Sequence, residues 1–481
     1  MILFLYMPAK NLQLVILNVS TKRGEKSMQK KSIGFGFKGW MLILFQAIAY
    51  VAFQSFTQYP LNILADFYGG ATKISSIYSI CAIVGIVIQV VLVSFIAKMK
   101  SIKKFSIVLG AITLVLAFLV MTMPPMPVWY VAYALINIFA VLYSTLAIGL
   151  LVGQWFPTRK GTVMGIATLA FPIANGLLGP FATSVFAPIG MAEAMQQQPV
   201  IFGLGGAIGK AFLPFFIVSI VGWLIGLIFI KDYPEQCGAY RDNDKSLTPE
   251  IANAIMMAEI ENKKTSVWTY VNTLKSKEFW FGTITVGFLL SCSIGLMSQT
   301  MTIVNAGIGE DKYSAVMASI MIFGCIGSFV IGLLDTKIGT KKAMIISSTL
   351  MVIAGVLGLL GNGIVLWIAL IFVALFMGAA SNFGVSLAAQ YWRREDFGRV
   401  FALSSPIGSA ISSASPVIIA GLLFGATGYK GHAGAFGLIL GCGIVALILM
   451  ILYKPADIKK LDDKYRAAAG KELDDALVGR K

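Results

Sequence analysis

Long uninterrupted apolar runs are the feature that most limits how this chain can fold. From Trp40 onward there are about twelve such runs, each near the roughly 20 residues that a helix needs to cross a membrane. They lack the short alternation of a membrane β-barrel. With 57% apolar and 12% charged residues and a mean hydropathy of +0.82, the 481-residue chain is too apolar for a soluble globule. The sequence therefore predicts an all-α membrane protein with twelve transmembrane helices. The expected spans are residues 40–62, 74–97, 105–123, 128–153, 162–187, 211–230, 279–301, 313–334, 342–360, 364–389, 399–425 and 433–453.

The basic residues gather in the links on one side of these spans. Clusters precede the first span and follow the second, fourth, sixth, eighth and tenth, whereas the opposite links carry few charges. Because lysine and arginine clusters mark the cytoplasmic face, we expect a multi-pass protein of the cell inner (plasma) membrane with both termini in the cytoplasm. The net charge of +16 is thus topology information and does not indicate nucleic-acid binding.

A long polar link divides the spans into two sets of six. The expected regions are a cytoplasmic N-terminal segment (1–39), a first six-helix bundle (40–230), a cytoplasmic linker (231–278), a second six-helix bundle (279–453) and a cytoplasmic tail (454–481). Within the linker, Thr248 as cap and Pro249 at the first helical position predict an amphipathic helix that ends near Lys264. Trp268 and Tyr270 after it suit the headgroup level of a membrane.

Residues 1–27 do not read as part of the membrane domain. The segment is interrupted by Pro8, Lys10, Asn11 and Asn18 and lacks the basic region of a signal peptide. We interpret it as an over-extended start, with Met28 as the better initiator. The alternative is an interfacial helix.

Two pairs of links indicate that the halves are copies of one unit. The segment Gly332 to Lys342 (G-L-L-D-T-K-I-G-T-K-K) has a degraded copy at Ser94 to Lys104, 332 − 94 = 238 residues earlier. The segment Q-W-F-P-T-R-K-G-T-V-M-G after span four matches Y-W-R-R-E-D-F-G-R-V-F-A after span ten, where Trp155 aligns with Trp392 at 392 − 155 = 237 residues. Parallel six-helix repeats joined by a long link are typical of secondary transporters.

On these residues the chain resembles the major facilitator superfamily. Gly332 to Lys342 is similar to that family's loop between the second and third helices of a half, although Thr336 stands at the acidic position and Asp335 one place early. Q-W-F-P-T-R-K-G resembles the oxalate/formate antiporter and monocarboxylate-transporter branch. The resemblance implies two pseudo-symmetric six-helix bundles, alternating access, and a substrate site lined by the first and fourth helices of each half.

No Asp, Glu, Lys, Arg or His falls in the middle of any expected span. Intramembrane charges usually mark ion pathways, so this absence leaves no side-chain carboxylate to carry a coupling proton. The cavity cations that the resembling branch usually has are also missing, which disfavours a small dianion. We therefore expect exchange, uniport, or a proton carried on the substrate itself.

Polar residues at helical spacing in the expected cavity helices are the candidate substrate ligands. The alternative for each is a hydrogen bond between helices, which is how many polar side chains are used in membranes. The substrate-binding candidates are Gln46, Tyr50, Gln54, Asn137, Ser144, Ser291, Gln299, Asn382 and Ser386. The gating candidates lie in the segment Gly332 to Lys342, which we call the hinge, and in the links after spans four and ten. They are Asp335, Gly339, Lys341, Lys342, Arg159 and Arg393.

Catalytic and cofactor interpretations have little support in the sequence. There is no phosphate loop or pair of catalytic carboxylates, His432 has no partner in a motif, and the five cysteines show no metal or disulfide spacing. We expect no enzyme activity, no cofactor and no metal. The expected partners are a small-molecule substrate and membrane lipids, without nucleic acid, and the expected state is a monomer.

The predicted function is secondary active or facilitative transport of a monocarboxylate-like organic acid, with a symport or antiport mechanism. Two alternatives remain from the sequence. One is uptake of a larger amphipathic carboxylate such as a bile or sterol acid. The other is a transporter-like receptor that does not transport.

Overall fold

The computed structural model describes residues 34–58, 60, 71–96, 99, 101–122, 126–186, 207–244, 249–264, 266–425 and 428–469. The interpretation of residues 1–27 and the proposed cap at Thr248 lie outside these residues.

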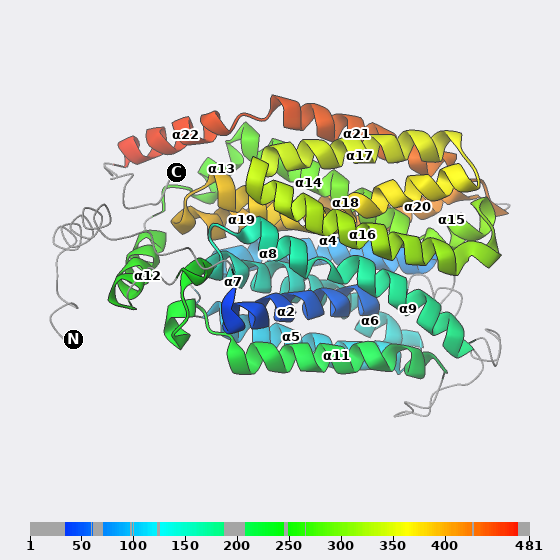
Figure 1. Cartoon of the computed structure of the whole chain (residues 1–481), viewed down its shortest axis with the longest axis horizontal. Coiled ribbons are helices and arrows are strands. Elements are labelled where there is room, and N and C mark those ends of the chain that lie inside the picture. Colours follow the sequence, from blue (N-terminus) through cyan, green and yellow to red (C-terminus); the bar gives the residue numbers. More distant parts are fainter. Residues whose placement is uncertain are drawn as a thin grey trace.

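The first half consists of six membrane-length helical units that run roughly parallel to one another (Figure 1). Three of them are built from more than one helical segment. The units are α2 (Gly36–Phe53) continued by the π-helix η2 (Gln54–Gln58); α4 (Ala71–Ile96); α5 (Ile102–Met121); α6 (Met126–Val141) with the π-helix η3 (Leu142–Ala147) and α7 (Ile148–Trp155); α8 (Lys160–Ala167) with α9 (Ala170–Phe186); and α11 (Ala207–Phe229).

The second half repeats this arrangement. Its units are α14 (Lys277–Met297) with α15 (Thr300–Gly307); α16 (Tyr313–Ile338); α17 (Thr340–Leu360); α18 (Ile364–Tyr391); α19 (Arg394–Ser413) with α20 (Ser415–Leu423); and α21 (Ala433–Leu452). The turn η6 (Glu310–Lys312) precedes α16, and the two-residue strands β1 (Phe424–Gly425) and β2 (Gly428–Tyr429) pair antiparallel between α20 and α21.

These units confirm the predicted fold class. Among the described residues, eleven helices are long and apolar enough to cross a membrane. The twelfth unit is α4, which spans 26 residues and is apolar over Lys73–Gln89. Small elements complete the chain outside the spans: η4 (Pro234–Cys237), η5 (Arg241–Asn243), α12 (Pro249–Lys264), α13 (Tyr270–Leu274) and α22 (Pro455–Ala468). The predicted linker helix is α12.

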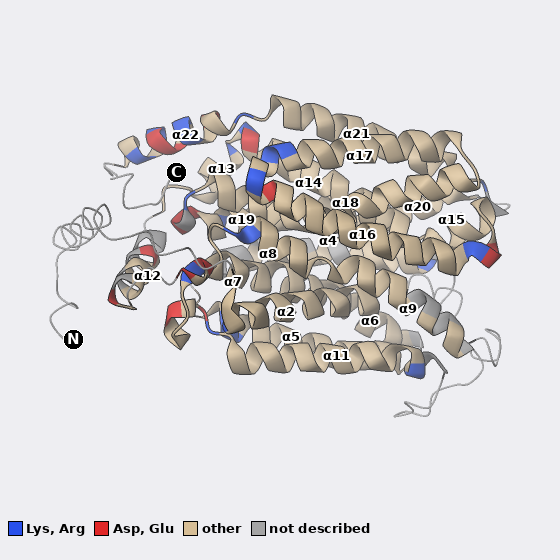
Figure 2. Ribbon diagram, in the orientation of Figure 1, with Lys and Arg blue, Asp and Glu red and all other residues tan. Residues whose placement is uncertain are grey.

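Charged side chains collect at one end of the helix bundle (Figure 2). We call it the charged end; it is the end at which α14 and α19 begin and α18 ends, and where α12 and α22 lie. At the opposite end, the far end, the described charges are confined to a few positions such as η6 and the start of α11.

The two halves meet through helices that carry small residues. α8 and α9 of the first half pack against α16, and α4 packs against α19 and α20. The backbones of α8 and α16 touch, because a Cβ placed on Gly165 would lie 2.9 Å from the Cα of Gly332. Such close approach is what small residues provide in membrane helices.

The first part of the linker is bound to the first half by two carboxylates. Asp232 accepts hydrogen bonds from Ser101 Oγ (2.6 Å) and from the backbone N–H of Lys103 (2.8 Å) at the start of α5. Asp242 accepts from the backbone N–H groups of Thr158 (3.1 Å) and Arg159 (3.2 Å) just before α8. Both carboxylates lie where a helix N-terminus favours negative charge.

The end of the linker is bound to the second half and to the tail helix. Trp268 Nε1 donates to Asp462 Oδ1 of α22 (2.9 Å), and its ring makes edge contacts with Trp392 and Tyr465. Trp268 is buried. The N–H of Trp268 thus has its partner inside the protein, in the paired Asp462 of the tail.

Buried ion pairs hold α22 in place. Arg393 Nε contacts Asp462 Oδ2 at 2.8 Å, and Arg466 contacts Asp462 (3.0 Å) and Asp396 (2.8 Å). Burial by itself raises the pKa of the Asp462 carboxyl, but the hydrogen bonds from Arg393, Arg466 and Trp268 outweigh it and hold that pKa below its ordinary value. The tail helix is thus fastened to the segment between α18 and α19.

Removing one member of this cluster is expected to loosen the tail. Arg466→Met leaves the Asp462 and Asp396 carboxylates buried without one of their cations, which costs about 3–5 kcal/mol when a buried pair is broken. We expect a lower melting temperature in detergent and faster proteolysis of the tail. The control is Lys460→Met, since the Lys460 side chain is 80% exposed. Equal melting and proteolysis in the two variants would contradict this role.

Candidate functional site

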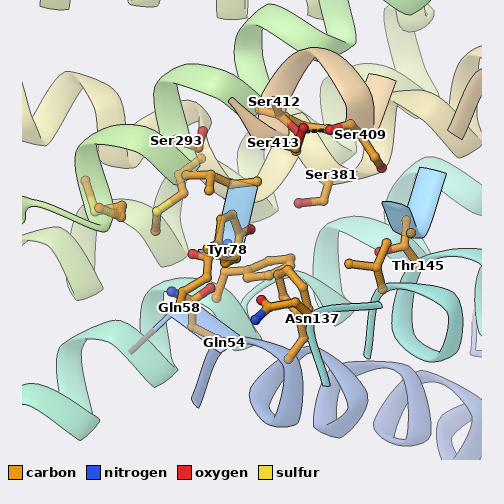
Figure 3. Close-up of a pocket in the computed structure, with 18 of the residues that line it drawn as sticks. Gln54, Gln58, Tyr78, Asn137, Thr145, Ser293, Ser381, Ser409, Ser412 and Ser413 are labelled. Carbon is orange, nitrogen blue, oxygen red and sulfur yellow. Dashed lines mark hydrogen bonds between the residues drawn. The ribbon is translucent and has the colours of Figure 1, made fainter. Parts of the chain in front are cut away.

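A cavity of about 90 Å³ lies between the two halves (Figure 3). Its lining comes from both halves, including α4 and α6 of the first and α14 and α19 of the second. One buried water needs roughly 10–15 Å³ on the same measure, so in this conformation the space suits a small solute.

The cavity is uncharged, and polar groups are set among a mostly apolar surface. Among the residues that the structure describes there, no side chain carries a charge. Five amides and seven hydroxyls supply its polarity. They are Gln54, Gln58, Gln89, Asn137, Asn175, Tyr78, Thr145, Ser293, Ser381, Ser409, Ser412 and Ser413.

Two π-helical segments bring part of this lining into position. Gln54 and Gln58 are the first and last residues of η2, and Thr145 lies in η3. A π-helix departs from the regular i→i−4 hydrogen bonding of an α-helix, and such departures are frequent at functional sites. Hydropathy patterns do not reveal them, because both segments lie within otherwise continuous apolar helices.

One hydrogen-bond relay crosses the cavity between the halves. Gln54 Nε2 donates to Asn175 Oδ1 at 2.6 Å, and Asn175 Nδ2 lies 3.7 Å from the sulfur of Met377 in the second half. A thioether is a weak acceptor. The Asn175 amide is therefore a donor that a better acceptor on a bound solute can take over.

Two amide oxygens on the cavity wall have no hydrogen-bond donor. Asn137 uses its Nδ2 to bond the carbonyl of Tyr133 (2.6 Å), but its Oδ1 is buried without a partner. The Oε1 of Gln89 is in the same state. Buried acceptors without partners are costly, so the site calls for a solute or water that donates O–H or N–H groups.

Of the nine predicted substrate ligands, Gln54 and Asn137 line the cavity. Three others are used inside the first half. Gln46 Nε2 donates to the carbonyl of Ser144 (2.7 Å), and Ser144 Oγ donates to the carbonyl of Ala140 (2.7 Å). Tyr50 packs on the Phe171 ring with centroids 4.6 Å apart.

The remaining four join helices or halves. Ser291 Oγ bonds the carbonyl of Ile411 on α19 (3.1 Å). Gln299 Nε2 reaches Ser75 Oγ of the first half at the far end (3.5 Å). Asn382 and Thr168 Oγ1 hydrogen bond across the halves (3.1 Å). Ser386 is buried beside Asp335, near the turn that joins α16 to α17.

Sequence reasoning did not select several lining residues, among them Thr145, Ser293 and Ser381 in the expected cavity helices. Gln58 follows Gln54 by one helical turn, so it continues the same polar stripe. Gln89 is an amide within the apolar α4, a helix not expected to line the site. Asn175 lies in α9 and Ser412 in α19, two helices that pack against the opposite half. The polarity of Gln89 and Asn175 within lipid-facing stretches was the available signal.

Among the gating candidates, Asp335 is the one that touches the opposite half. Its Oδ1 accepts from Thr340 Oγ1 at 2.5 Å, and a Cβ on Gly161 would lie 2.5 Å from its Oδ2. The carboxylate thus rests against the first turn of α8. Gly339 has φ +91°, a conformation that favours glycine and turns the chain from α16 into α17.

The four basic gating candidates are engaged elsewhere or exposed. Lys341 Nζ donates to the carbonyl of Tyr453 at the end of α21 (2.7 Å), and Lys342 is exposed. Arg159 lies over the Phe35 ring, 5.7 Å from its centroid. Arg393 pairs with Asp462 of the tail helix α22.

Comparison with known proteins identifies the fold. Residues 279–473 match the family model described as Major Facilitator Superfamily. No curated protein matches the sequence. The family model thus matches within the second half and the tail, and it does not distinguish the oxalate/formate or monocarboxylate branch.

Several solved transporters share the fold over most of this chain at low sequence identity. The proton:xylose symporter XylE bound to 6-bromo-6-deoxy-D-glucose matches with a TM-score of 0.68 at 11% identity, over 89% of this chain and 98% of that one. The E. coli fucose:proton symporter FucP matches with a TM-score of 0.54 at 14% identity, over 86% and 97%. The human organic anion transporter MFSD10 matches with a TM-score of 0.56 at 12% identity, over 85% and 97%.

The contact between the halves at the charged end can be tested by cross-linking. Thr162 Oγ1 and Thr336 Oγ1 lie 2.9 Å apart across it. We expect Thr162→Cys with Thr336→Cys to form a disulfide readily in membranes. Adding Gly165→Val should slow this reaction, because the new side chain meets the backbone of Gly332.

The control for the cross-link is Gly421→Val, since a Cβ at Gly421 meets nothing within 4 Å. Cross-linking that is equally fast with Gly165→Val and Gly421→Val would show that α8 and α16 do not pack as described.

Proposed function

We propose that this protein is a secondary transporter that moves a small organic acid with a single carboxyl group, by alternating access of its two halves to the two sides of the membrane. The observation that carries the proposal is the uncharged, amide- and hydroxyl-lined cavity between the halves. Such a chamber offers hydrogen bonds but no counter-charge.

The cavity chemistry supports binding of the acid in its protonated form. A carboxylic acid has one O–H donor and one carbonyl acceptor. The unpartnered Oδ1 of Asn137 and Oε1 of Gln89 accept from the O–H, and the Asn175 amide donates to the carbonyl. The proton then crosses the membrane on the substrate, so the protein needs no carboxylate of its own in the cavity.

The same lining argues against other ligands. Desolvating a dianion without a cation is costly, so oxalate-like substrates fit poorly. The volume of about 90 Å³ disfavours a bile or sterol acid in this conformation.

A neutral hydroxylated solute is the second candidate. Its hydroxyl groups satisfy the two unpartnered amide oxygens equally well. XylE and FucP, which share the fold, are sugar symporters.

We further propose that the charged end faces the cytoplasm, with both termini there, because basic clusters favour that side. The inner (plasma) membrane, the five-region domain division and a monomeric state complete the proposal. Asp335 acts as a latch that holds the cytoplasmic side closed by lying at the N-terminus of α8, where a helix dipole favours a carboxylate.

Gln54→Ala tests the site directly. It removes the amide that holds Asn175, so we expect a KM for uptake raised by about tenfold, which is the loss of roughly one hydrogen bond worth 1–1.5 kcal/mol. The measurement is initial uptake of a labelled monocarboxylate into proteoliposomes, with counterflow of the label as a check that the protein transports. The control is Gln236→Ala, an exposed linker residue.

Unchanged kinetics in Gln54→Ala would remove this residue from the site. Absence of counterflow for every acid and sugar tested would favour the non-transporting receptor.

Proton movement tests the coupling mechanism. If the proton travels on the substrate, uptake of a weak acid acidifies the proteoliposome interior, whereas a neutral analogue of similar size moves no protons. The measurement uses a pH-sensitive dye trapped inside. Protons that move in a fixed ratio with a neutral or permanently charged substrate would contradict this mechanism, since such a ratio needs a titratable group on the protein.

A further inference from the structure

A second, smaller cavity adjoins the central one. Its volume is about 30 Å³, and it shares Thr145, Leu290, Ser381 and Ser409 with the central cavity. The two spaces are therefore neighbours separated by a common set of side chains.

Three helices place the smaller cavity between the central one and the charged end. α14 begins at the charged end and reaches the smaller cavity with Thr283 before the central one with Met297. α18 ends there and passes Met377 at the central cavity before Leu387 at the smaller one. α19, which also begins at the charged end, passes the smaller cavity first, at Phe401.

Hydroxyl groups line the smaller cavity as they line the central one. Ser404, Ser405 and Thr283 add to the shared residues. The Oγ1 of Thr283 and the Oγ of Ser405 are buried and have no hydrogen-bond partner. The space holds about two water molecules on the measure of 10–15 Å³ each. The smaller cavity thus extends the row of hydroxyl groups from the central cavity toward the charged end, within a mostly apolar lining.

An aromatic stack closes the smaller cavity. Phe401, on the cavity wall, stacks on Phe397 with centroids 5.7 Å apart and planes within 5°. Lys160 of the first half lies over the Phe397 ring, with its Nζ 3.8 Å from the ring centroid. Lys160 is buried. The stack therefore joins the two halves through a cation–π contact.

Glycines on α7 make room for the two rings. A Cβ on Gly153 would overlap the Phe397 ring, and one on Gly149 would lie 3.3 Å from the Phe401 ring. The rings of the second half therefore fit a smooth face of the first half. Separating the halves at the charged end would free both rings and uncover Lys160 together.

We propose that the substrate passes between the central cavity and the charged end through the smaller cavity, and that Lys160, Phe397 and Phe401 are the gate that closes this passage. When the gate opens, the Lys160 ammonium leaves the Phe397 ring and donates a hydrogen bond to the carbonyl oxygen of the protonated acid. This inference rests on the proposed function for the nature of the substrate. The gate itself is defined by contacts that do not depend on it.

Thiol accessibility from the two sides of the membrane tests the gate without any substrate. The reporter is Ser405→Cys in a full-length background whose five native cysteines are replaced, with Ser404→Cys as a second reporter. A membrane-impermeant thiol reagent is applied to inside-out and right-side-out vesicles. Each variant is first checked for a single symmetric peak by size exclusion in detergent.

While Lys160, Phe397 and Phe401 are unchanged, we expect the reagent to modify the reporter thiol slowly from the charged-end side. Phe401→Ala and, separately, Lys160→Met should each raise that rate by up to about tenfold, since the ring stacking and the buried cation–π contact are each worth up to about one decade in an equilibrium. Phe329→Ala is the matched control, because that ring is 45% exposed on the outer surface of α16. It should leave the rate unchanged.

Three results would overturn the gate. In the first, the reporter thiol is modified equally slowly in Phe401→Ala, Lys160→Met and Phe329→Ala. In the second, it is modified fast while the three gate residues are unchanged, and in the third its rate rises only when the reagent is applied from the far side. The substrate assignment fails separately. If Phe401→Ala and Lys160→Met open the passage but no organic acid is transported, the gate stands and the proposed substrate falls.

Discussion

The structure depends on one constraint: within a membrane, a polar group must find its partner inside the protein. In this chain the constraint is met without charges in the middle of the spans. Most of the buried polar side chains bond a carbonyl of their own helix or a neighbouring one, as Ser291 does with Ile411. Some buried polar atoms have no partner, and at the cavity these are the oxygens of Asn137 and Gln89. They are the acceptors that the proposed solute would satisfy.

The charged end shows the opposite strategy. There, carboxylates and cations are buried together, and each cluster fastens one segment of the chain to one half. Asp232 and Asp242 bind the start of the linker to the first half, and Trp268, Asp462 and Arg466 bind its end and the tail to the second. Because each anchor belongs to one half, the segment between them, α12, bridges the two halves. α12 itself packs against α19 of the second half and against η4 at the start of the linker.

Much of the fold could be predicted from the sequence, because hydrophobic length and the placement of lysines are strong local signals. The hinge at Gly339 and the helix from Pro249 to Lys264 lie where the sequence predicted them. The site was harder. Helical spacing identifies a polar stripe but not whether it faces a cavity or another helix: Gln46 and Gln54 share one stripe, and only Gln54 reaches the cavity. The π-helices, the ring stack at Phe397 and the burial of Trp268 depend on contacts between distant segments, which no local pattern contains.

The central claim is that the substrate chamber lacks a counter-charge. Calorimetric titration of the purified protein with a matched pair of acids, one monocarboxylic and one dicarboxylic with the same carbon chain, tests it most directly. The account predicts binding of the monocarboxylic acid that strengthens as the pH falls toward its pKa, and no measurable binding of the dianion at neutral pH. Tighter binding of the dianion, weakened by high salt, would contradict it, because that result requires a cation in the chamber.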